Sequence, residues 1–389
     1  MVDFFCPSKI ITGDGCATAL GAEAVSLGAG RVWLVTDKVL REKTECVTQA
    51  LASLKAAGVP VEVFDDVEPD PLVTTAVRST HLARSFAPDV IVGLGGGSAL
   101  DIAKATATFL ANDLPLEKMW GRGNVPKAGT PLILLPTTGG TGSEASTSCV
   151  LTDTQADGSH MKRSIVSQRV VPNTAIVDPL LTLTVPPAVT AATGMDALTH
   201  AVETYVSKEA QPLTDTLAME AVRLIGKYLR RAVANGSDIE ARRGMSNAAL
   251  MAGLAFSNGQ LGIVHAFAMV MGGQFNISHG VANALMLPYV MEFNEMAATR
   301  RFAQIAEALG ERVEGLSERD AAHRATLAVR RLAEDVGIPR RLEEVKIPRE
   351  AVPSLAAEVF KNQRLRGVNP RGTTVKDLAG ILEHAAQGS

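Results

Sequence analysis

The sequence predicts a Rossmann-like α/β domain with a mostly parallel sheet, followed by an all-helical domain. Over residues 1–180, short runs rich in β-branched residues alternate with helix-like segments, a pattern typical of a parallel sheet with helices on its faces. Beyond that point the strand-like runs stop. The length of 389 residues suits two domains or one large α/β unit. We therefore predict an α/β domain over residues 1–180 and an all-helical domain over residues 181–389.

The individual elements follow from local patterns. Five short runs in which valine, isoleucine and leucine predominate are predicted strands, at residues 31–36, 61–64, 89–93, 132–135 and 174–177. In the second half, helix-like segments are separated by clusters of Gly, Pro or Asn. These predicted helices cover residues 188–206, 213–234, 238–256, 260–271, 297–309, 318–336, 349–362 and 374–386.

The composition argues against several classes of protein. Lys plus Arg number 38 against 41 Asp plus Glu, so the charge balance favours neither a nucleic-acid partner nor an anionic membrane surface. The cysteines show no CxxC spacing, which argues against a zinc finger and a secreted disulfide scaffold. The first ten residues lack the basic and apolar regions of a signal peptide. We expect free thiols and a cytoplasmic location.

Residues 244–291 contain no Asp, Glu, Lys or Arg. About 20 apolar residues suffice to span a bilayer, so this stretch is long enough for membrane-spanning helices. However, asparagine, glutamine, serine and histidine residues are spread through it, together with the pair Gly272 and Gly273. Polar side chains are costly in hydrocarbon. We therefore predict buried helices within a globular domain and no membrane span.

A glycine-rich loop joins the predicted strand 89–93 to a predicted helix over residues 99–110. It consists of Gly95, Gly96, Gly97 and Ser98. Glycines at such a turn let the backbone approach a pyrophosphate, and free N–H groups at the helix N-terminus stabilise its charge. Ser98 is expected to cap the helix. The alternative is a tight turn that needs glycine for its backbone angles, and neither a strict GxGxxG nor a Walker lysine is present.

A second polar loop follows the predicted strand 132–135. Residues 136–144 read PTTGGTGSE and include Thr137, Thr138 and Thr141. Ligands bind at the carboxyl ends of strands in open α/β sheets, so two such loops favour a dinucleotide site. Asp37 follows the strand 31–36, where a carboxylate can bind ribose hydroxyls and favours NAD over NADP. The alternative is that Asp37 caps the helix that follows it.

Four residues in the second half predict a metal site. Asp196 and His200 are four apart on a predicted helix and share one face, and His265 and His279 lie in the charge-free stretch. In one continuous helix these two histidines would be about 21 Å apart, so we expect the helix to break at Gly272 and Gly273. One carboxylate and three imidazoles suit Zn²⁺, Fe²⁺ or another divalent first-row metal.

The alternative for each of these histidines is a hydrogen-bonded core residue. The remaining histidines lie in polar or charged contexts and are predicted to be on the surface; they are His81, His160, His323 and His384.

Five motifs together resemble those of the iron-containing, or group III, alcohol dehydrogenases. Residues 95–104 resemble the family's GGGSxxDxxK loop, and residues 136–144 its PTTxGTGSE loop. Residues 194–203, GMDALTHAVE, are similar to its first metal motif, and residues 279–284 to its HGxxNA segment. Asn369, Pro370 and Arg371 fit as well.

The resemblance implies an N-terminal domain that binds NAD(H) and a helical C-terminal domain that binds a metal, Fe²⁺ or Zn²⁺. It implies reversible hydride transfer between a small alcohol and the nicotinamide, and a homodimer or higher homo-oligomer. The implied metal ligands, through which catalysis occurs, are Asp196, His200, His265 and His279. The implied cofactor contacts are Asp37, Gly95, Gly96, Gly97, Ser98, Asp101, Thr137, Thr138, Thr141, Ser146 and Lys162.

Two residues depart from the family pattern. Met269 stands where the family usually has a second histidine four residues after His265, which is thought to help relay a proton. Asp70 replaces the usual asparagine of the PNP turn. The alternatives are a polyol dehydrogenase, a maleylacetate reductase, an NAD-using lyase of the dehydroquinate synthase type and a nucleotide-binding scaffold without activity.

Overall fold

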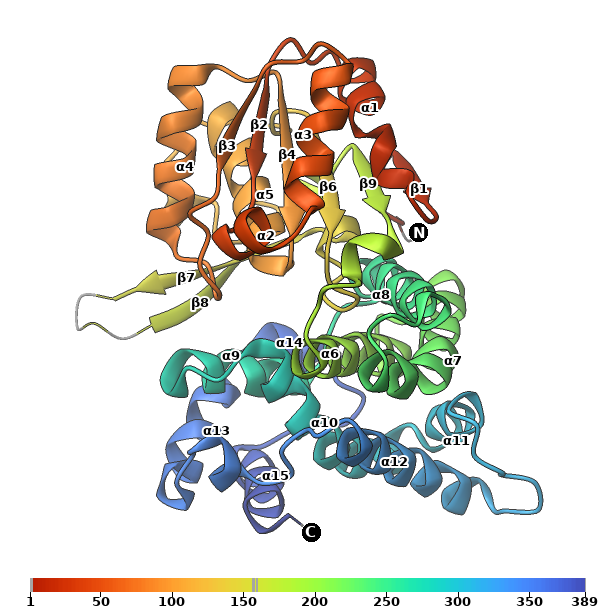
Figure 1. Cartoon of the computed structure of the whole chain (residues 1–389). Coiled ribbons are helices and arrows are strands. Elements are labelled where there is room, and N and C mark those ends of the chain that lie inside the picture. The colour runs from red at the N-terminus through yellow and green to blue at the C-terminus, as the bar shows by residue number, and fades with distance from the viewer. Residues whose placement is uncertain (1–2, 156–157, 159, 389) are drawn as a thin grey trace. The chain divides into compact units, whose positions relative to one another are not determined.

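The computed structural model describes residues 3–155, 158 and 160–388. The chain forms two compact units, Met1–Val185 and Pro186–Ser389. Figure 1 draws the first unit in red to yellow-green and the second in green to blue. Each unit has its own hydrophobic core, and we describe each by itself.

The first unit contains a six-stranded sheet in which every pairing is parallel. The strand order is β1 (Lys9–Thr12), β9 (Thr174–Val177), β6 (Leu132–Pro136), β4 (Val90–Gly95), β2 (Val32–Val35) and β3 (Val61–Phe64). The five predicted strands are all present, which confirms the parallel sheet. The edge strand β1 was not predicted.

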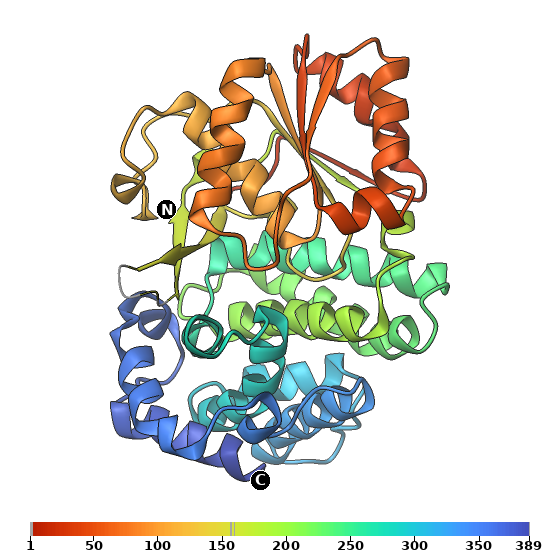
Figure 2. The same ribbon diagram turned by 60° about the vertical axis from the view of Figure 1, so that its left-hand side comes forward.

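Helices cover both faces of this sheet (Figure 2). The alternation along β2 shows why: Val32 and Leu34 pack into one hydrophobic cluster, whereas Trp33 and Val35 pack into the other. The first cluster includes residues of α1 (Leu20–Ser26) and α3 (Cys46–Ala56). The second includes residues of α4 (Val73–Phe86) and α5 (Gly97–Ala111). Strands buried on both faces are typical of parallel sheets, which explains their unbroken apolar sequences.

A smaller sheet in the same unit was not predicted. Strands β7 (Ser148–Thr154) and β8 (His160–Val166) form an antiparallel hairpin in which Thr152 lies opposite Lys162. The short strand β5 (Gly121–Arg122) pairs in parallel with β8. The hairpin therefore carries Lys162, one of the expected cofactor contacts.

The described part of the second unit is helical and contains no strand. Its helices are α6 (Pro187–Val206), α7 (Pro212–Ala234), α8 (Ile239–Gly259), α9 (Ile263–Phe275), α10 (His279–Asn294), α11 (Thr299–Ala308), α12 (Glu318–Asp335), α13 (Val352–Lys361), α14 (Gln363–Val368) and α15 (Val375–Gln387). Each predicted helix overlaps one of these. Helices α10 and α14 were not predicted. The first unit also contains the small helix α2 (Lys38–Lys43), and short 3₁₀ segments occur in both units.

The charge-free stretch 244–291 forms most of α8, all of α9 and most of α10. Ala248, Phe267 and Leu287 are buried in the core of the unit, so the prediction of buried helices is confirmed. In the described residues no single helix is both long and apolar enough to cross a membrane; α8 and α9 meet that test only together, across a bend of 103°.

The expected helix break at Gly272 and Gly273 is wrong. Helix α9 continues through both glycines to Phe275. The chain turns instead at Asn276, which adopts a left-handed conformation with φ of 54° and donates its N–H to the carbonyl of Gly272. Asparagine is, after glycine, a favoured residue at this position after a helix.

Candidate metal centre and dinucleotide loops

One face of α6 carries three buried polar residues. Asp196, His200 and Glu203 are spaced by four and then three residues, so a helix places them side by side. All three are at most 4% exposed. Polar groups buried in this way require partners, and those partners come from α9 and α10.

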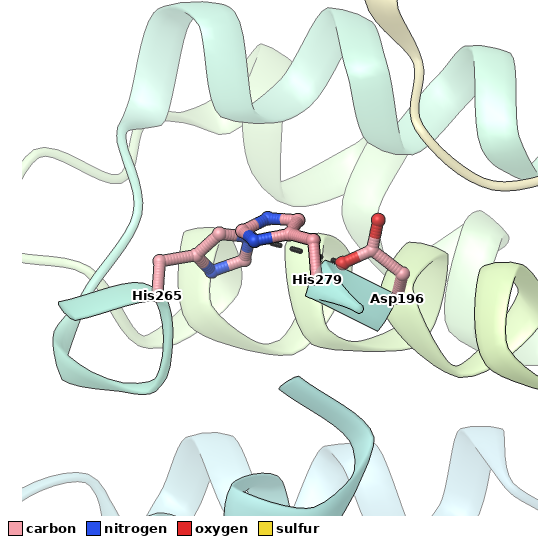
Figure 3. A group of neighbouring side chains, drawn as sticks. All are labelled: Asp196, His265 and His279. Atoms are coloured by element: carbon pink, nitrogen blue, oxygen red, sulfur yellow. Dashed lines mark ion pairs between the residues drawn. The ribbon is translucent and has the colours of Figure 1, made fainter. Parts of the chain in front are cut away.

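The turn at Asn276 places His279, at the start of α10, next to His265 on α9. Their ring centroids are 5.3 Å apart. One ligand atom from each of Asp196, His265 and His279 lies within 4.8 Å of the others (Figure 3). The His200 ring lies 4.8 Å from that of His265, and its Nε2 is 3.9 Å from Asp196 Oδ1. The structure thus brings together all four residues predicted to hold a metal.

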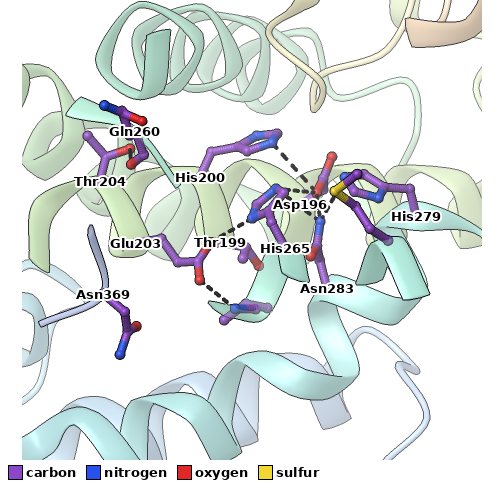
Figure 4. A network of polar contacts seen from close by, with 12 residues as sticks. Asp196, Thr199, His200, Glu203, Thr204, Gln260, His265, His279, Asn283 and Asn369 are labelled. Atoms are coloured by element: carbon purple, nitrogen blue, oxygen red, sulfur yellow. Dashed lines mark hydrogen bonds and ion pairs between the residues drawn. The ribbon is translucent and has the colours of Figure 1, made fainter. Parts of the chain in front are cut away.

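Glu203 fixes the orientation of His265. Its Oε1 accepts the backbone N–H of Val264 at 2.6 Å, and its Oε2 lies 2.6 Å from His265 Nδ1 (Figure 4). When Glu203 is ionised it can only accept hydrogen bonds, so Nδ1 of the imidazole is then the donor and Nε2 keeps its lone pair. That lone pair faces Asp196 Oδ1, 4.0 Å away. A carboxylate behind a histidine in this way is the usual second partner of a metal-binding imidazole.

Asn283 marks the point where the lone pairs converge. Its Nδ2 lies 2.6 Å from Asp196 Oδ1, 3.2 Å from His265 Nε2 and 3.1 Å from His279 Nε2. One electropositive group therefore touches three of the four expected ligands. The arrangement fits a divalent cation, because a carboxylate and neutral imidazoles are suitable donors for Fe²⁺ or Zn²⁺.

The electrostatics of the group support this fit. Burial alone would raise the pKa of Asp196, but His200, His279 and His265 outweigh it and lower that pKa. Burial lowers the pKa of His265 to about 4, so this imidazole is neutral at neutral pH. Burial raises the pKa of Glu203 to about 7, against the effect of the N–H groups that it accepts. The centre holds an ionised carboxylate beside an imidazole able to donate its lone pair.

Glu203 and Asn283 were not predicted as site residues, although a signal was present for both. Glu203 follows His200 by three residues and Asn283 follows His279 by four, so each lies on the same helix face as a predicted ligand. The remaining four histidines, His81, His160, His323 and His384, are exposed, as predicted.

The two predicted dinucleotide loops lie next to each other in the first unit. Gly95 ends β4 opposite Pro136 at the end of β6, and the N–H of Thr137 donates to the carbonyl of Gly95 at 2.9 Å. Gly95 has φ of +156°, and a Cβ there would come within 2.7 Å of Ala99. A Cβ at Gly97 would lie 2.9 Å from Thr141. Gly97 therefore permits the close approach of the two loops, and Gly95 permits the tight turn into α5.

The expected cap of α5 at Ser98 is wrong. The helix begins two residues earlier than predicted, at Gly97, with Gly96 before it and no side-chain cap. Because the first turn starts within the glycines, its backbone N–H groups are not screened by a side chain, and they remain suited to a phosphate. Asp37 caps α2 by accepting the N–H of Leu40 at 2.9 Å. Its other oxygen, Oδ2, lies 3.7 Å from the position of a Cβ on Gly95, so Asp37 also borders the loop.

A buried lysine joins α5 to the segment after the second loop, and it was not predicted as a site residue. Lys104 on α5 is fully buried and donates to the carbonyls of Ser146 and Ser148 and to Ser146 Oγ, at 2.8 to 2.9 Å. Asp101, one turn earlier, accepts from Ser143 Oγ at 2.7 Å and from the N–H of Val150 at 2.9 Å. Helix α5 thereby holds the segment that follows the second loop. Both oxygens of Asp101 are engaged in this contact.

Comparison with known proteins assigns the chain to a family. The family model described as iron-containing alcohol dehydrogenase matches residues 7–179, and that of the C-terminal region of the same family matches residues 190–386. The NAD-dependent methanol dehydrogenase of Bacillus methanolicus is 39% identical, over 99% of this chain and 100% of that protein. The 1,3-propanediol dehydrogenase of Klebsiella pneumoniae is 41% identical, over 99% of each chain.

Comparison with a solved structure supports the same family. The alcohol dehydrogenase from Oenococcus oeni superposes with a TM-score of 0.96 at 40% identity, over 99% of this chain and 100% of that one. Family models that together cover both units, and relatives of this identity along nearly the whole chain, establish that the chain belongs to the iron-containing alcohol dehydrogenase family.

Proposed function

We propose that this chain catalyses the reversible, NAD(H)-dependent oxidation of a small alcohol to an aldehyde or ketone, at a metal held by Asp196, His200, His265 and His279. As a member of its family it is an oxidoreductase that acts on CH–OH groups. The observation that carries the proposal is the convergence of Asp196, His265 and His279 around one point, with His200 beside them.

A divalent metal bound at this point would supply a Lewis acid that polarises the alcohol oxygen. The chain's own residues prepare the place for it. Glu203 holds the Nε2 lone pair of His265 towards Asp196, and burial excludes water from the four ligands except His279, which is partly exposed. The geometry is therefore set before the substrate arrives.

In the first unit, we propose that the glycines at residues 95–97 and the N-terminus of α5 bind the pyrophosphate of NAD(H); the start of α5 within these glycines supports this. We propose that Asp37, which borders this loop, binds a ribose hydroxyl and disfavours a 2′-phosphate, so that NAD is preferred over NADP. Bound NAD(H) would accept or donate the hydride at C4 of the nicotinamide, while the protein provides orientation and excludes water.

Met269 changes the proton step. It lies one helical turn after His265 on α9, and its sulfur is 3.8 Å from Asn362 Nδ2. A thioether does not titrate, so we propose that the alcohol proton leaves through water or the ribose hydroxyls. A Met269→His variant is expected to add an ionisation near neutral pH to the profile of kcat/KM against pH.

That profile is measured by NADH absorbance over a pH series, with Met296→His as the control because Met296 is 82% exposed. A Met269→His profile identical to the parent profile would remove position 269 from proton transfer.

The proposed activity is tested by anaerobic purification, metal analysis and a screen of short alcohols, diols and aldehydes by NADH absorbance. Stoichiometric NADH formation from an alcohol is expected. Turnover without net NADH would indicate a lyase of the dehydroquinate synthase type, and NAD(H) binding without turnover in metal-replete protein would indicate a scaffold. A strong preference for polyols in the same screen would favour a polyol dehydrogenase.

We also propose a reducing, cytoplasmic location and a homodimer or higher homo-oligomer. The four cysteines, Cys6, Cys16, Cys46 and Cys149, are free thiols, which supports a reducing compartment.

Analytical ultracentrifugation of the metal-loaded protein tests the proposed oligomer, and a monomer would contradict it.

A further inference from the structure

Lys162, an expected cofactor contact, is already paired with a carboxylate in this chain. Its side chain is 6% exposed and forms an ion pair with Oδ1 of Asp70, whose side chain is 31% exposed. Among the described residues, the Lys162 ammonium donates its hydrogen bond to Asp70. The pair joins two segments that are far apart in the sequence, the turn after β3 and the hairpin strand β8.

The backbone holds these two segments in place independently of the ion pair. The N–H of Thr152 on β7 donates to the carbonyl of Pro71 at 2.8 Å, and Leu72 forms a parallel bridge with Thr152. Thr152 in turn lies opposite Lys162 in the hairpin. Asp70 is therefore kept close to Lys162 by the main chain, and its charge is not needed to bring the segments together.

Asp70 is one of few residues other than glycine with a left-handed backbone, with φ of 53°. Asparagine and aspartate are the residues other than glycine that best tolerate this conformation. An asparagine at position 70 would therefore keep the turn and remove only the negative charge. The carboxylate at position 70 therefore differs from an asparagine mainly in its negative charge, which lies next to Lys162.

We propose that Asp70 is a positioning residue that weakens the binding of NADH by neutralising Lys162, and thereby speeds release of the reduced cofactor. This inference rests on the proposed function, because it needs NAD(H) as the cofactor, and on the contact between Lys162 and the cofactor that the family resemblance implies. A cationic group attracts an anionic cofactor more weakly when a carboxylate already compensates its charge. NADH carries one more negative charge than NAD⁺, because reduction removes the positive charge of the nicotinamide ring. Asp70 should therefore disfavour NADH more than NAD⁺.

The test compares NADH and NAD⁺ affinities of metal-loaded, full-length variants by fluorescence titration. Asp70→Asn is expected to lower the NADH dissociation constant on the order of tenfold, with a smaller decrease for NAD⁺ and a slower NADH dissociation rate in stopped flow. Added salt should reduce the difference. Adenosine is uncharged, so its affinity should stay unchanged; a change there would show a structural effect on the site and overturn the proposal.

Two further variants show whether Asp70 acts through Lys162. Lys162→Met should weaken NADH binding, and adding Asp70→Asn to it should change the affinity less than twofold. Lys162→Gln serves the same comparison if the methionine variant does not fold. Asp153→Asn is the matched control, because Asp153 pairs with Arg163 on the same hairpin and is 29% exposed. Its NADH affinity should equal that of the parent.

The possible failures are distinct. If Lys162→Met weakens NADH binding but Asp70→Asn does not tighten it, the role of Asp70 is wrong while Lys162 remains a cofactor contact. If Lys162→Met binds NADH as the parent does, the assignment of Lys162 to the cofactor site is wrong, and the inference falls with it.

Discussion

A His265→Ala variant is expected to lose its metal and at least about a thousandfold in kcat/KM for alcohol oxidation, equivalent to about 4 kcal/mol of transition-state stabilisation. His265 is the central residue of the group: its Nε2 faces Asp196, its ring lies beside those of His200 and His279, and Glu203 orients it. Metal content after anaerobic purification and the rate of NADH formation measure both losses.

The matched control is His323→Ala in the same helical unit. His323 has a side chain that is 53% exposed and contacts only Glu295 among the ion pairs of the described residues. This variant should keep the metal and the parent kcat/KM. If His265→Ala retained both metal and activity, the proposed centre would be wrong.

Glu203→Gln is expected to lower metal affinity about 10- to 100-fold. The parent carboxylate accepts two hydrogen bonds, from the N–H of Val264 and from His265 Nδ1. A glutamine has one acceptor oxygen, so it cannot accept both of these hydrogen bonds whichever way the amide turns. If the amide donates to Nδ1, the imidazole proton moves to Nε2 and blocks the lone pair that the metal needs.

Competition with a chelator measures the affinity of the parent and of Glu203→Gln for Fe²⁺ or Zn²⁺, independently of turnover. Glu292→Gln is the control. Glu292 lies on α10, its side chain is 40% exposed, and it pairs with Arg330 on α12. The NADH affinity of both variants should match that of the parent. Parent metal affinity in Glu203→Gln would show that the carboxylate does not orient His265 for a metal.

Much of the site could be predicted because its signals are local. Asp196 and His200 lie one helical turn apart, and that spacing alone puts both side chains on one face. The two loops follow parallel strands, whose carboxyl ends share one edge of a sheet. The predicted reversal between His265 and His279 also exists, but at Asn276, because glycines can continue a helix and asparagine can end one.

Helix α10 could not be predicted because it contains Pro288, which removes a helical hydrogen bond and normally ends a helix. In the folded unit Pro288 is surrounded by buried apolar residues such as Leu287 and Tyr289, and this packing outweighs the local preference. The hairpin of β7 and β8 was missed for a similar reason: its strands pair with each other and not with the main sheet, so it breaks the alternation of strands and helices.

The contacts between polar side chains could not be predicted from the sequence, for a different reason. Glu203 meets His265 and Asp70 meets Lys162 across long stretches of sequence, and no pattern in a single chain specifies such a contact. Only the assembled fold shows that the carboxylate of Glu203 is directed to Nδ1 and that the charge of Lys162 is compensated.

Metal titration of the stripped enzyme tests the central claim most directly. Chelator-treated protein should form no NADH from an alcohol, and anaerobic addition of Fe²⁺ or Zn²⁺ should restore activity in proportion to bound metal, up to one ion per chain. The same titration of His265→Ala should restore nothing. Full activity of the stripped parent with no bound metal would contradict a catalytic metal at Asp196, His200, His265 and His279.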